Sequence, residues 1–236
     1  MIKVSAAERE RWPKDADTAL AVQDRLRACV TAGAPTPPRA PRLIAGLDVA
    51  YAKDDSLVAA AVCVLDLETH RVVEQATAVR PVEFPYLPGL LAFRELPSLL
   101  DALERLGGTP DVLVCDGYGL AHPRRFGLAC HVGVLTALPA FGVAKTPYVG
   151  AFAEPGPERG DWTPLTHGGD EVGRALRTRR GVKPVFVSVG HAIPIGDAAA
   201  LTLRLAPVYR LPETTRQADA LSRRVLADAL ARAGAR

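Results

Sequence analysis

The chain has 236 residues, 48% of them hydrophobic and 23% charged, and a formal net charge of +3. This hydrophobic share can build a folded core and excludes a disordered chain. No apolar run reaches the roughly 18 residues that a membrane-spanning helix needs. Because residues 1–15 are charged and polar where a secretion signal would be apolar, we expect a cytoplasmic protein without a membrane partner.

Cysteine and basic residues narrow the protein classes further. The four cysteines, Cys29, Cys63, Cys115 and Cys130, contain no C-x-x-C pair, which predicts reduced core residues and neither a disulfide framework nor a zinc site. Of the 29 basic residues 24 are arginine, which suits phosphate contacts but is equally the product of a GC-rich genome. Charge alone therefore leaves nucleic-acid binding open.

The first predicted elements are a helix and three strands. Apolar residues at helical spacing predict a surface helix over residues 16–30, and the Pro-rich residues 34–41 predict a stiff connector. Three segments of strand character follow at residues 43–51, 57–66 and 71–80. Since the turns between them are short, they are expected to form an antiparallel meander.

The rest of the chain alternates helix and strand, which together with the meander predicts an α/β fold with a mixed sheet and helices outside. A leucine stripe predicts a helix over residues 96–106 with Pro97 in its first turn, and residues 111–116 have the pattern of a buried parallel strand. Residues 150–182, rich in Gly, Pro and charge, are expected to be irregular. The remaining predicted elements are a helix near 126–137, strands at 140–144 and 184–189, and a last helix from Thr214, where Thr214-x-x-Gln217 resembles a capping box.

Two aspartates occupy unusual positions. Asp48 lies inside the apolar strand IAGLDVAY, where a buried lone carboxylate is costly, and Asp116 ends the apolar strand DVLVCD. Ligands bind at that edge of an α/β sheet, and two carboxylates there could hold Mg²⁺ and lower the pKa of a bound water. The alternatives are an Asp48 that faces solvent on a half-exposed strand and an Asp116 that is only a turn residue.

Three further charged residues are candidates with ordinary alternatives. Glu95 and Asp219 each lie near a predicted helix start, where an acidic side chain is favourable without any catalytic role. Lys145 ends the segment GVAK and could neutralise a phosphate, although a lysine at a strand end is mostly solvated. The phosphate-loop, zinc-protease and serine-hydrolase motifs are absent from the sequence.

Two loops have the composition of a nucleic-acid site. In FPYLPG, residues 84–89, two prolines restrict the backbone conformation around Tyr86. An aromatic side chain on such a rigid loop can insert between stacked bases. The alternative is a turn whose tyrosine packs into the core. Residues 116–131 add three glycines that let backbone approach a flat ligand, together with Arg124 and Arg125 for phosphate.

Taken in order, these segments resemble the endonuclease V family, the nucleases that nick nucleic acid near a deaminated adenine. The resemblance implies a ribonuclease H-like fold in one domain, with a lead-in (1–42), a catalytic core (43–219) and the end of a C-terminal helix (220–236). The matching strings are IAGLDVAY (44–51), FPYLPGLLAFRE (84–95), PDVLVCDGYGLAHPRRFGLACHVGV (110–134), GVAK (142–145), PVFVSVGH (184–191) and YRLPETTRQAD (209–219).

The family builds its metal site from carboxylates. The resemblance implies that Asp48 and Asp116 are the principal ligands of Mg²⁺, for which Mn²⁺ can substitute. It implies that Glu95 completes the site directly or through water, and that Asp219 orients a water or a second metal. Lys145 would lie beside the scissile phosphate.

The resemblance also assigns the contacts to nucleic acid. The PYLP loop would fill the gap left when inosine leaves the base stack, and the flipped base would enter a glycine-rich pocket. Family members cut the second phosphodiester bond 3′ to the inosine and leave a 3′-hydroxyl and a 5′-phosphate. The implied wedge residues are Pro85, Tyr86, Leu87 and Pro88, and the implied pocket residues are Gly89, Leu91, Gly117, Gly119, His122 and Gly127.

The leading hypothesis is a monomeric, Mg²⁺-dependent DNA repair endonuclease that acts on DNA containing deoxyinosine. The alternatives are an inosine-specific endoribonuclease acting on single-stranded RNA and a catalytically silent nucleic-acid-binding module. The silent module is disfavoured because Asp48, Glu95 and Asp116 are all present. Tyr118 and Cys130 depart from the residues common in the family, which could tune substrate preference without removing a carboxylate.

Overall fold

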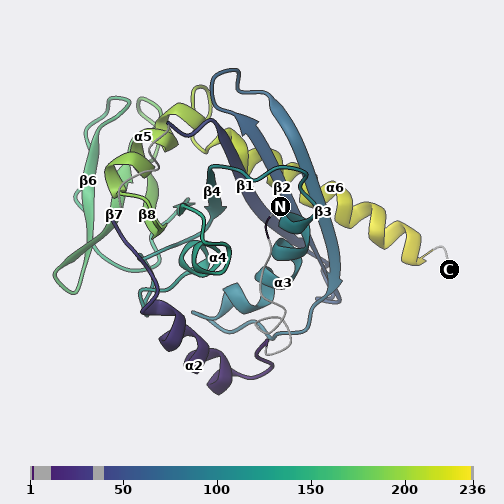
Figure 1. The fold of residues 1–236 in the computed structure, drawn as a ribbon. Coiled ribbons are helices and arrows are strands. Elements are labelled where there is room, and N and C mark those ends of the chain that lie inside the picture. Colours follow the sequence, from purple (N-terminus) through teal and green to yellow (C-terminus); the bar gives the residue numbers. More distant parts are fainter. Residues whose placement is uncertain (1, 3–11, 34–39, 235–236) are drawn as a thin grey trace.

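An eight-stranded mixed sheet forms the centre of the protein, with the strand order β3-β2-β1-β4-β5-β8-β7-β6 (Figure 1). The computed structural model describes residues 2, 12–33 and 40–234. Within these residues, no helix combines the length and the apolar character needed to cross a bilayer. The strands are β1 (Leu43–Tyr51), β2 (Leu57–Asp66), β3 (Val72–Pro81), β4 (Val112–Asp116), β5 (Ala140–Ala144), β6 (Trp162–His167), β7 (Asp170–Leu176) and β8 (Val185–His191). The helices are α2 (Ala16–Arg27), α3 (Leu91–Glu104), α4 (Leu128–Thr136), α5 (Ile195–Leu205) and α6 (Glu213–Gly234).

The first three strands form the expected meander. β1 pairs antiparallel with β2, and β2 pairs antiparallel with β3. β4 and β5 then extend the sheet in parallel from β1, as expected of short apolar strands that alternate with helices. The predicted combination of an antiparallel meander with parallel strands is confirmed.

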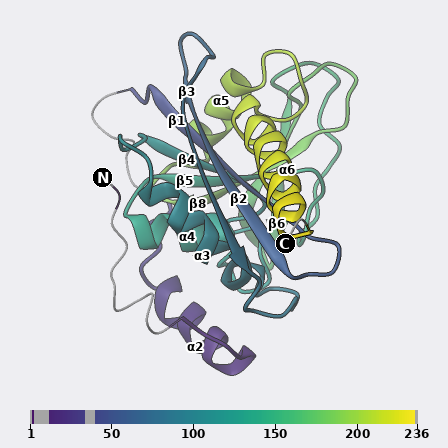
Figure 2. The ribbon, with the colours of Figure 1, turned by 90° about the vertical axis from the view of Figure 1, so that its right-hand side faces the viewer.

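Helices cover both faces of the sheet, α3 and α4 on one and α5 and α6 on the other (Figure 2). β2 is rich in alanine because it lies between two helices. Ala60 and Val62 belong to the core beneath α3, whereas Ala61 and Cys63 pack against α6. The small side chains let both helices approach the strand closely, which places α3 and α6 at the same region of the sheet.

The expectation of an irregular segment over residues 150–182 is wrong for residues 162–176. β6 and β7 pair antiparallel there, and β7 joins β8 at the end of the sheet. The turn between them is Gly168-Gly169, with φ angles of +61° and +89°. Positive φ at both central residues is the geometry of the tight turn that matches the twist of paired strands. The Gly-Gly pair therefore indicates a hairpin between two short strands. It was missed because the segment as a whole is rich in Gly, Pro and charged residues.

The helix with the leucine stripe begins earlier than predicted. α3 begins at Leu91, so Pro97 lies inside the helix and not in its first turn. A proline there has no N–H to give to the carbonyl four residues back, which is that of Phe93. The indole Nε1 of Trp12 donates to the Phe93 carbonyl at 2.8 Å and replaces the missing bond. The segment before α2 thereby stabilises the helix that carries Glu95.

The last helix begins at Glu213, and the expected capping box is not formed. The hydroxyl of Thr214 is buried without a partner among the described residues, and Gln217 Nε2 donates to Glu213 Oε1 at 2.6 Å. Thr214 lies so close to Gly46 of β1 that a Cβ on Gly46 would overlap the Thr214 carbonyl. Packing against β1 therefore sets where α6 begins. The sequence pattern also missed α5, Ile195–Leu205.

His131 of α4 is a buried histidine that lies among aromatic rings. Its ring lies 5.6 Å from Trp12, 4.9 Å from Phe93 and 5.1 Å from Phe126, measured between ring centroids. Neither ring nitrogen has a hydrogen-bond partner among the described residues. Burial, and to a smaller extent the charge of Arg25, lowers the pKa of His131 to about 3. The folded protein therefore holds this imidazole in its neutral form.

Acid is expected to destabilise the protein through His131. As the pH falls below the ordinary histidine pKa of about 6.5, the unfolded chain takes up a proton that the folded chain does not, so the free energy of unfolding decreases. Between pH 8 and pH 5.5 the wild type should lose about 1.4 kcal/mol more than His131→Phe, as measured by urea unfolding at both pH values. Equal losses in the two proteins would contradict the prediction.

Candidate active site

Asp48 and Asp116 lie side by side at one edge of the sheet. In the parallel pair of β1 and β4, Leu47 is opposite Cys115, so the residues that follow them are neighbours: Asp116 is the last residue of β4, and Asp48 lies inside β1, before its end at Tyr51. Both aspartates are half-buried. This is the sheet edge at which the sequence predicts a ligand.

Glu95 of α3 and Asp219 of α6 reach the same edge. Glu95 is only 8% exposed, and burial, followed by the charges of Asp48 and Asp116, raises its pKa to about 8. Burial, the charges of Asp116 and Asp219, and a hydrogen bond with Asp219 raise the pKa of Asp48 to about 7. The structure thus brings the four predicted carboxylates into one cluster, whose members repel one another.

Lys145 follows the end of β5 and lies beside this carboxylate cluster. Its Nζ is 3.3 Å from Oδ2 of Asp116, and its side chain is half-exposed. The guanidinium of Arg210 donates to the backbone carbonyl of Lys145 at 2.6 Å. It also donates to the carbonyls of Lys183 and Pro184, at 2.9 and 2.7 Å. The lysine therefore projects from a backbone that is held in place, and its half-exposed ammonium group is paired with Asp116.

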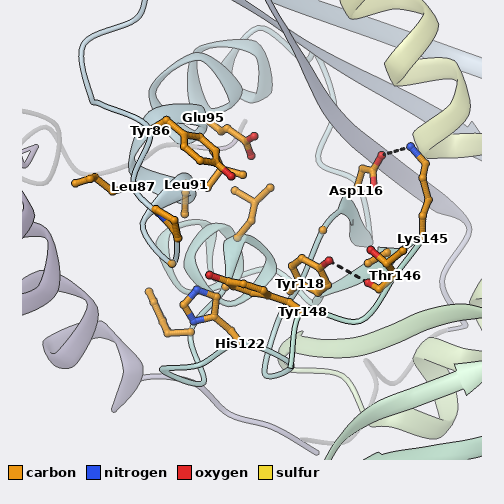
Figure 3. A pocket seen from close by; sticks show the side chains of 18 residues that line it. Tyr86, Leu87, Leu91, Glu95, Asp116, Tyr118, His122, Lys145, Thr146 and Tyr148 are labelled. Carbon is orange, nitrogen blue, oxygen red and sulfur yellow. Dashed lines mark hydrogen bonds and ion pairs between the residues drawn. The ribbon is translucent and has the colours of Figure 1, made fainter. Parts of the chain in front are cut away.

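A pocket of about 600 Å³ opens next to the carboxylate cluster. Figure 3 shows Tyr86 and Glu95 on one side of it, Asp116 and Lys145 on the opposite side, and His122 with Tyr148 below. A cavity of this size is in the range of small-ligand sites. The lining residues are Tyr86, Leu87, Pro88, Gly89, Leu91, Ala92, Glu95, Asp116, Gly117, Tyr118, His122, Phe126, Gly127, Leu128, Ala144, Lys145, Thr146 and Tyr148.

Tyr86 stands at the rim of this pocket and is 67% exposed. The alternative of a tyrosine packed into the core is therefore excluded. Phe84, two residues earlier, is the aromatic residue of the loop that enters the core, where it packs near Phe93. The loop is thus anchored by one ring and presents the other to solvent.

Comparison with known proteins decides the family. The sequence model of the endonuclease V family matches residues 25–220. Endonuclease V of Streptomyces coelicolor is 57% identical to this chain, over 99% of this chain and 100% of its own length. The chain belongs to the endonuclease V family.

Solved structures agree with this assignment. Endonuclease V from Streptomyces avermitilis has a TM-score of 0.90 and 54% identity, and the match covers 98% of this chain and 99% of that one. Ciona intestinalis endonuclease V, in complex with a 24mer DNA containing an inosine followed by a ribo-adenosine, has a TM-score of 0.76 and 25% identity over 89% of this chain and 96% of its own. The predicted ribonuclease H-like fold is confirmed, and the protein is a nuclease that hydrolyses phosphodiester bonds.

Five of the six pocket residues implied by the endonuclease V resemblance line the pocket, and Gly119 does not. The Gly119 N–H donates to Ser188 Oγ at 2.8 Å, and a Cβ on Gly119 would overlap the backbone carbonyl of Val189. This glycine therefore lets the loop after β4 lie directly on β8. Its contribution to the site is the placement of the neighbouring backbone, including Gly117 and Tyr118.

His122 is a neutral member of the pocket. Burial lowers its pKa to about 4, partly opposed by a hydrogen bond to the backbone of Gly89. Its Nδ1 accepts from the Arg124 N–H at 3.2 Å, so the ring proton of the neutral form is on Nε2. His122 therefore offers the pocket an uncharged ring whose orientation is set by two loops.

Arg124 and Arg125, the predicted phosphate contacts, both have partners within the protein. Arg124 Nη2 lies 2.6 Å from Asp24 of α2, and Arg125 Nη2 lies 3.2 Å from Asp170 at the start of β7. A phosphate would have to compete with or share these carboxylates. Their role toward nucleic acid stays a prediction.

The sequence reasoning missed Tyr148, an aromatic residue of the pocket. Tyr148 is 40% exposed, and its ring lies 5.4 Å from that of Tyr118 and 5.6 Å from that of His122. The Tyr118 hydroxyl donates to the Thr146 carbonyl at 3.0 Å, which links the loops after β4 and β5. Pro147 could have indicated Tyr148 in the sequence, since it restricts the backbone before an aromatic residue as the prolines on either side of Tyr86 do.

The donor set at the sheet edge suits a hard divalent cation. Asp48, Glu95 and Asp116 offer carboxylate oxygens, the ligands that Mg²⁺ prefers. Their mutual repulsion is the electrostatic condition that a bound cation relieves. Among the described residues no group of three or more His, Cys, Asp or Glu side chains already has metal-site geometry, and Lys145 is paired with Asp116. The residues therefore fit a cation by their chemistry, and coordination requires their side chains to rotate.

Proposed function

We propose that this nuclease is a Mg²⁺-dependent repair enzyme for deoxyinosine, the product of adenine deamination in DNA. It hydrolyses the second phosphodiester bond 3′ to the lesion and leaves a 3′-hydroxyl and a 5′-phosphate. One observation carries the proposal: Glu95, Asp116 and Lys145 line the same pocket as Gly89 and His122. The groups proposed for hydrolysis and the residues proposed to bind the base thus line one cavity. Such proximity is required if cleavage depends on recognition of a single base.

Recognition requires the base to leave the helix. A mismatched or damaged base is the least costly to extrude, which already favours deoxyinosine over paired adenine. Hypoxanthine presents an O6 acceptor and an N1–H donor where adenine has a donor and an acceptor. Backbone groups of Gly89, Gly117 and Gly127 line the pocket, and backbone N–H and C=O groups can distinguish the two patterns.

Hydrolysis requires an activated water, neutralised charge on the phosphate and a stabilised leaving oxygen. Asp48, Asp116 and Glu95 would hold Mg²⁺, which would supply charge neutralisation and a more acidic water. Asp219, which is hydrogen-bonded to Asp48, would orient a water molecule. Lys145 leaves Asp116 and places its ammonium group on the scissile phosphate. Endonuclease V enzymes are metal-dependent nucleases, in keeping with this division of roles.

An inosine-specific endoribonuclease is the second candidate function. The observation in its favour comes from the Ciona intestinalis relative, which was bound to a strand with a ribo-adenosine directly after the inosine. A 2′-hydroxyl beside the lesion is therefore compatible with the family's binding mode.

The deciding experiment is a gel assay on end-labelled oligonucleotides with one internal deoxyinosine or inosine, with Mg²⁺ or with EDTA. We expect Mg²⁺-dependent nicking of the DNA one nucleotide beyond the lesion. Cleavage of RNA alone would establish the endoribonuclease. Binding without cleavage of either strand would refute both enzymatic proposals.

Tyr86→Ala is expected to weaken binding to deoxyinosine duplexes by about tenfold, because a stacked aromatic ring contributes about 1–3 kcal/mol. Binding to unmodified duplexes should stay within about twofold, since no base leaves the stack there. The measurement is fluorescence anisotropy of labelled duplexes without divalent metal. Tyr86→Phe keeps the ring and should bind like the wild type, and an equal loss on both duplexes would contradict the wedge role.

A further inference from the structure

Gln23 of helix α2 makes hydrogen bonds to two residues that line the base pocket. This residue is 1% exposed, although it lies on a helix whose other faces meet solvent. Its Nε2 donates to the backbone carbonyl of Gly89 at 2.9 Å and to that of Phe126 at 3.3 Å. Gly89 and Phe126 both line the pocket and belong to different loops. A single amide group therefore joins the two loops.

The chemistry of the partners fixes the orientation of this amide. Both partners are carbonyl oxygens, which accept hydrogen bonds, so only the NH₂ end of Gln23 can face them. The Oε1 atom is buried and has no hydrogen-bond partner among the described residues. Burying an amide costs free energy that an apolar residue would not incur. The position of Gln23 is therefore explained by its two donated bonds and not by packing.

Neighbouring residues of α2 hold the helix against the second loop. Asp24 pairs with Arg124 at 2.6 Å, and Arg27 Nη1 donates to the Arg124 carbonyl at 3.3 Å. The Gly89 backbone is also hydrogen-bonded to His122 of that loop. Gln23 and His122 thus act on the same backbone unit from two sides, at the point where the loop carrying Tyr86 ends.

We propose that Gln23 is a positioning residue for base recognition, which sets the width of the pocket by holding the Gly89 and Phe126 carbonyls at fixed places. The inference rests on the proposed function, because the ligand of the pocket is taken to be the flipped hypoxanthine. It assigns a role to a residue that precedes the segment matched by the family, residues 25–220. Gln23 does not touch the reacting phosphate, so its effect should fall on binding of the lesion and not on the chemical step.

The test compares Gln23→Met and Gln23→Glu with the wild type. Methionine keeps the length of the side chain without any donor, and glutamate keeps the shape while replacing the donor by an acceptor. For both we expect Kd and KM for deoxyinosine DNA to rise about tenfold, the loss of one to two buried hydrogen bonds. The kcat and the Kd for unmodified DNA should stay within about twofold, since the chemical groups and phosphate contacts are unchanged.

The matched control is Asp15→Ala. The Asp15 side chain caps α2 by accepting from the Thr18 N–H at 2.8 Å and from the Thr18 hydroxyl at 2.9 Å, both within the first turn of the helix. This variant should lower the melting temperature and leave the preference for deoxyinosine intact. The inference is overturned if Gln23→Met keeps the wild-type preference, or if Asp15→Ala loses it to the same extent. A wild type without any preference for deoxyinosine would instead refute the proposed function, and the inference with it.

Discussion

Asp116→Ala is expected to lower the rate of nicking by at least about 10²–10³-fold while binding to deoxyinosine DNA persists. Asp116 is the only one of the predicted metal ligands that also pairs with Lys145, so its removal disturbs both the cation site and the lysine. The other residues that line the proposed base pocket are unchanged in this variant, so binding of the base is retained. The measurement is single-turnover cleavage with saturating enzyme, together with anisotropy on the same duplex.

Alanine is preferable to asparagine at this position. An asparagine followed by Gly117 would deamidate readily and regenerate aspartate, which would contaminate the measurement with active enzyme. Because Asp116 contributes to the raised pKa values of Asp48 and Glu95, Asp116→Ala should be at least as heat-stable as the wild type in the absence of metal. Asp228→Ala removes an exposed carboxylate from α6 and serves as the control. Nicking at the wild-type rate by Asp116→Ala would eliminate the assignment of the metal site.

Lys145→Gln is expected to lower kcat by about 10²-fold with KM changed less than about threefold. The ammonium group is assigned to charge that develops on the phosphate in the transition state, and the loss of one such group has effects of this size. The variant also removes the cation beside Asp116, so the change should be measured at several Mg²⁺ concentrations to separate weaker metal binding from slower chemistry.

Lys183→Gln provides the matched control for this lysine. Both lysines carry backbone carbonyls bound by Arg210, but Lys183 lies on the exposed connection between β7 and β8, outside the residues that line the pocket. It should cleave at the wild-type rate. An increase in KM without a change in kcat for Lys145→Gln would mean that the lysine contributes to binding alone.

The local sequence pattern was sufficient to predict much of the secondary structure. The ranges of β1, β2 and β5 agree with their predicted ranges because strand length, apolar content and short turns are properties of consecutive residues. The same reasoning singled out Asp48 inside one apolar strand and Asp116 at the carboxyl end of another. Glu95, Lys145 and the loop at residues 84–89 were candidates from the residues alone, and the resemblance to endonuclease V then implied their roles. Both the family and the fold class were confirmed.

Features that depend on residues far apart in the chain required the folded structure. Trp12 supplies the hydrogen bond that Pro97 removes from α3. Gly46 has no side chain, which lets the backbone of Thr214 at the start of α6 lie directly against β1. No local pattern contains these pairs, because Trp12 and Phe93 are 81 residues apart, and Gly46 and Thr214 are 168 residues apart. The start of α3, the absence of the capping box and the hairpin of β6 and β7 were mispredicted for related reasons: packing partners and turn geometry outweighed composition.

The electrostatics of the site have the same origin. A carboxylate's pKa depends on how much water its neighbours exclude and on which charges they bring. The residue types alone therefore indicated a metal site at Asp48 and Asp116, whereas the raised pKa values of Asp48 and Glu95 arise from α3 and α6 folding onto one sheet edge. The candidate site residues could be identified from the sequence because each catalytic role requires a particular type of side chain. Their mutual distances, and the contact of Gln23 with the pocket, exist only once the helices pack.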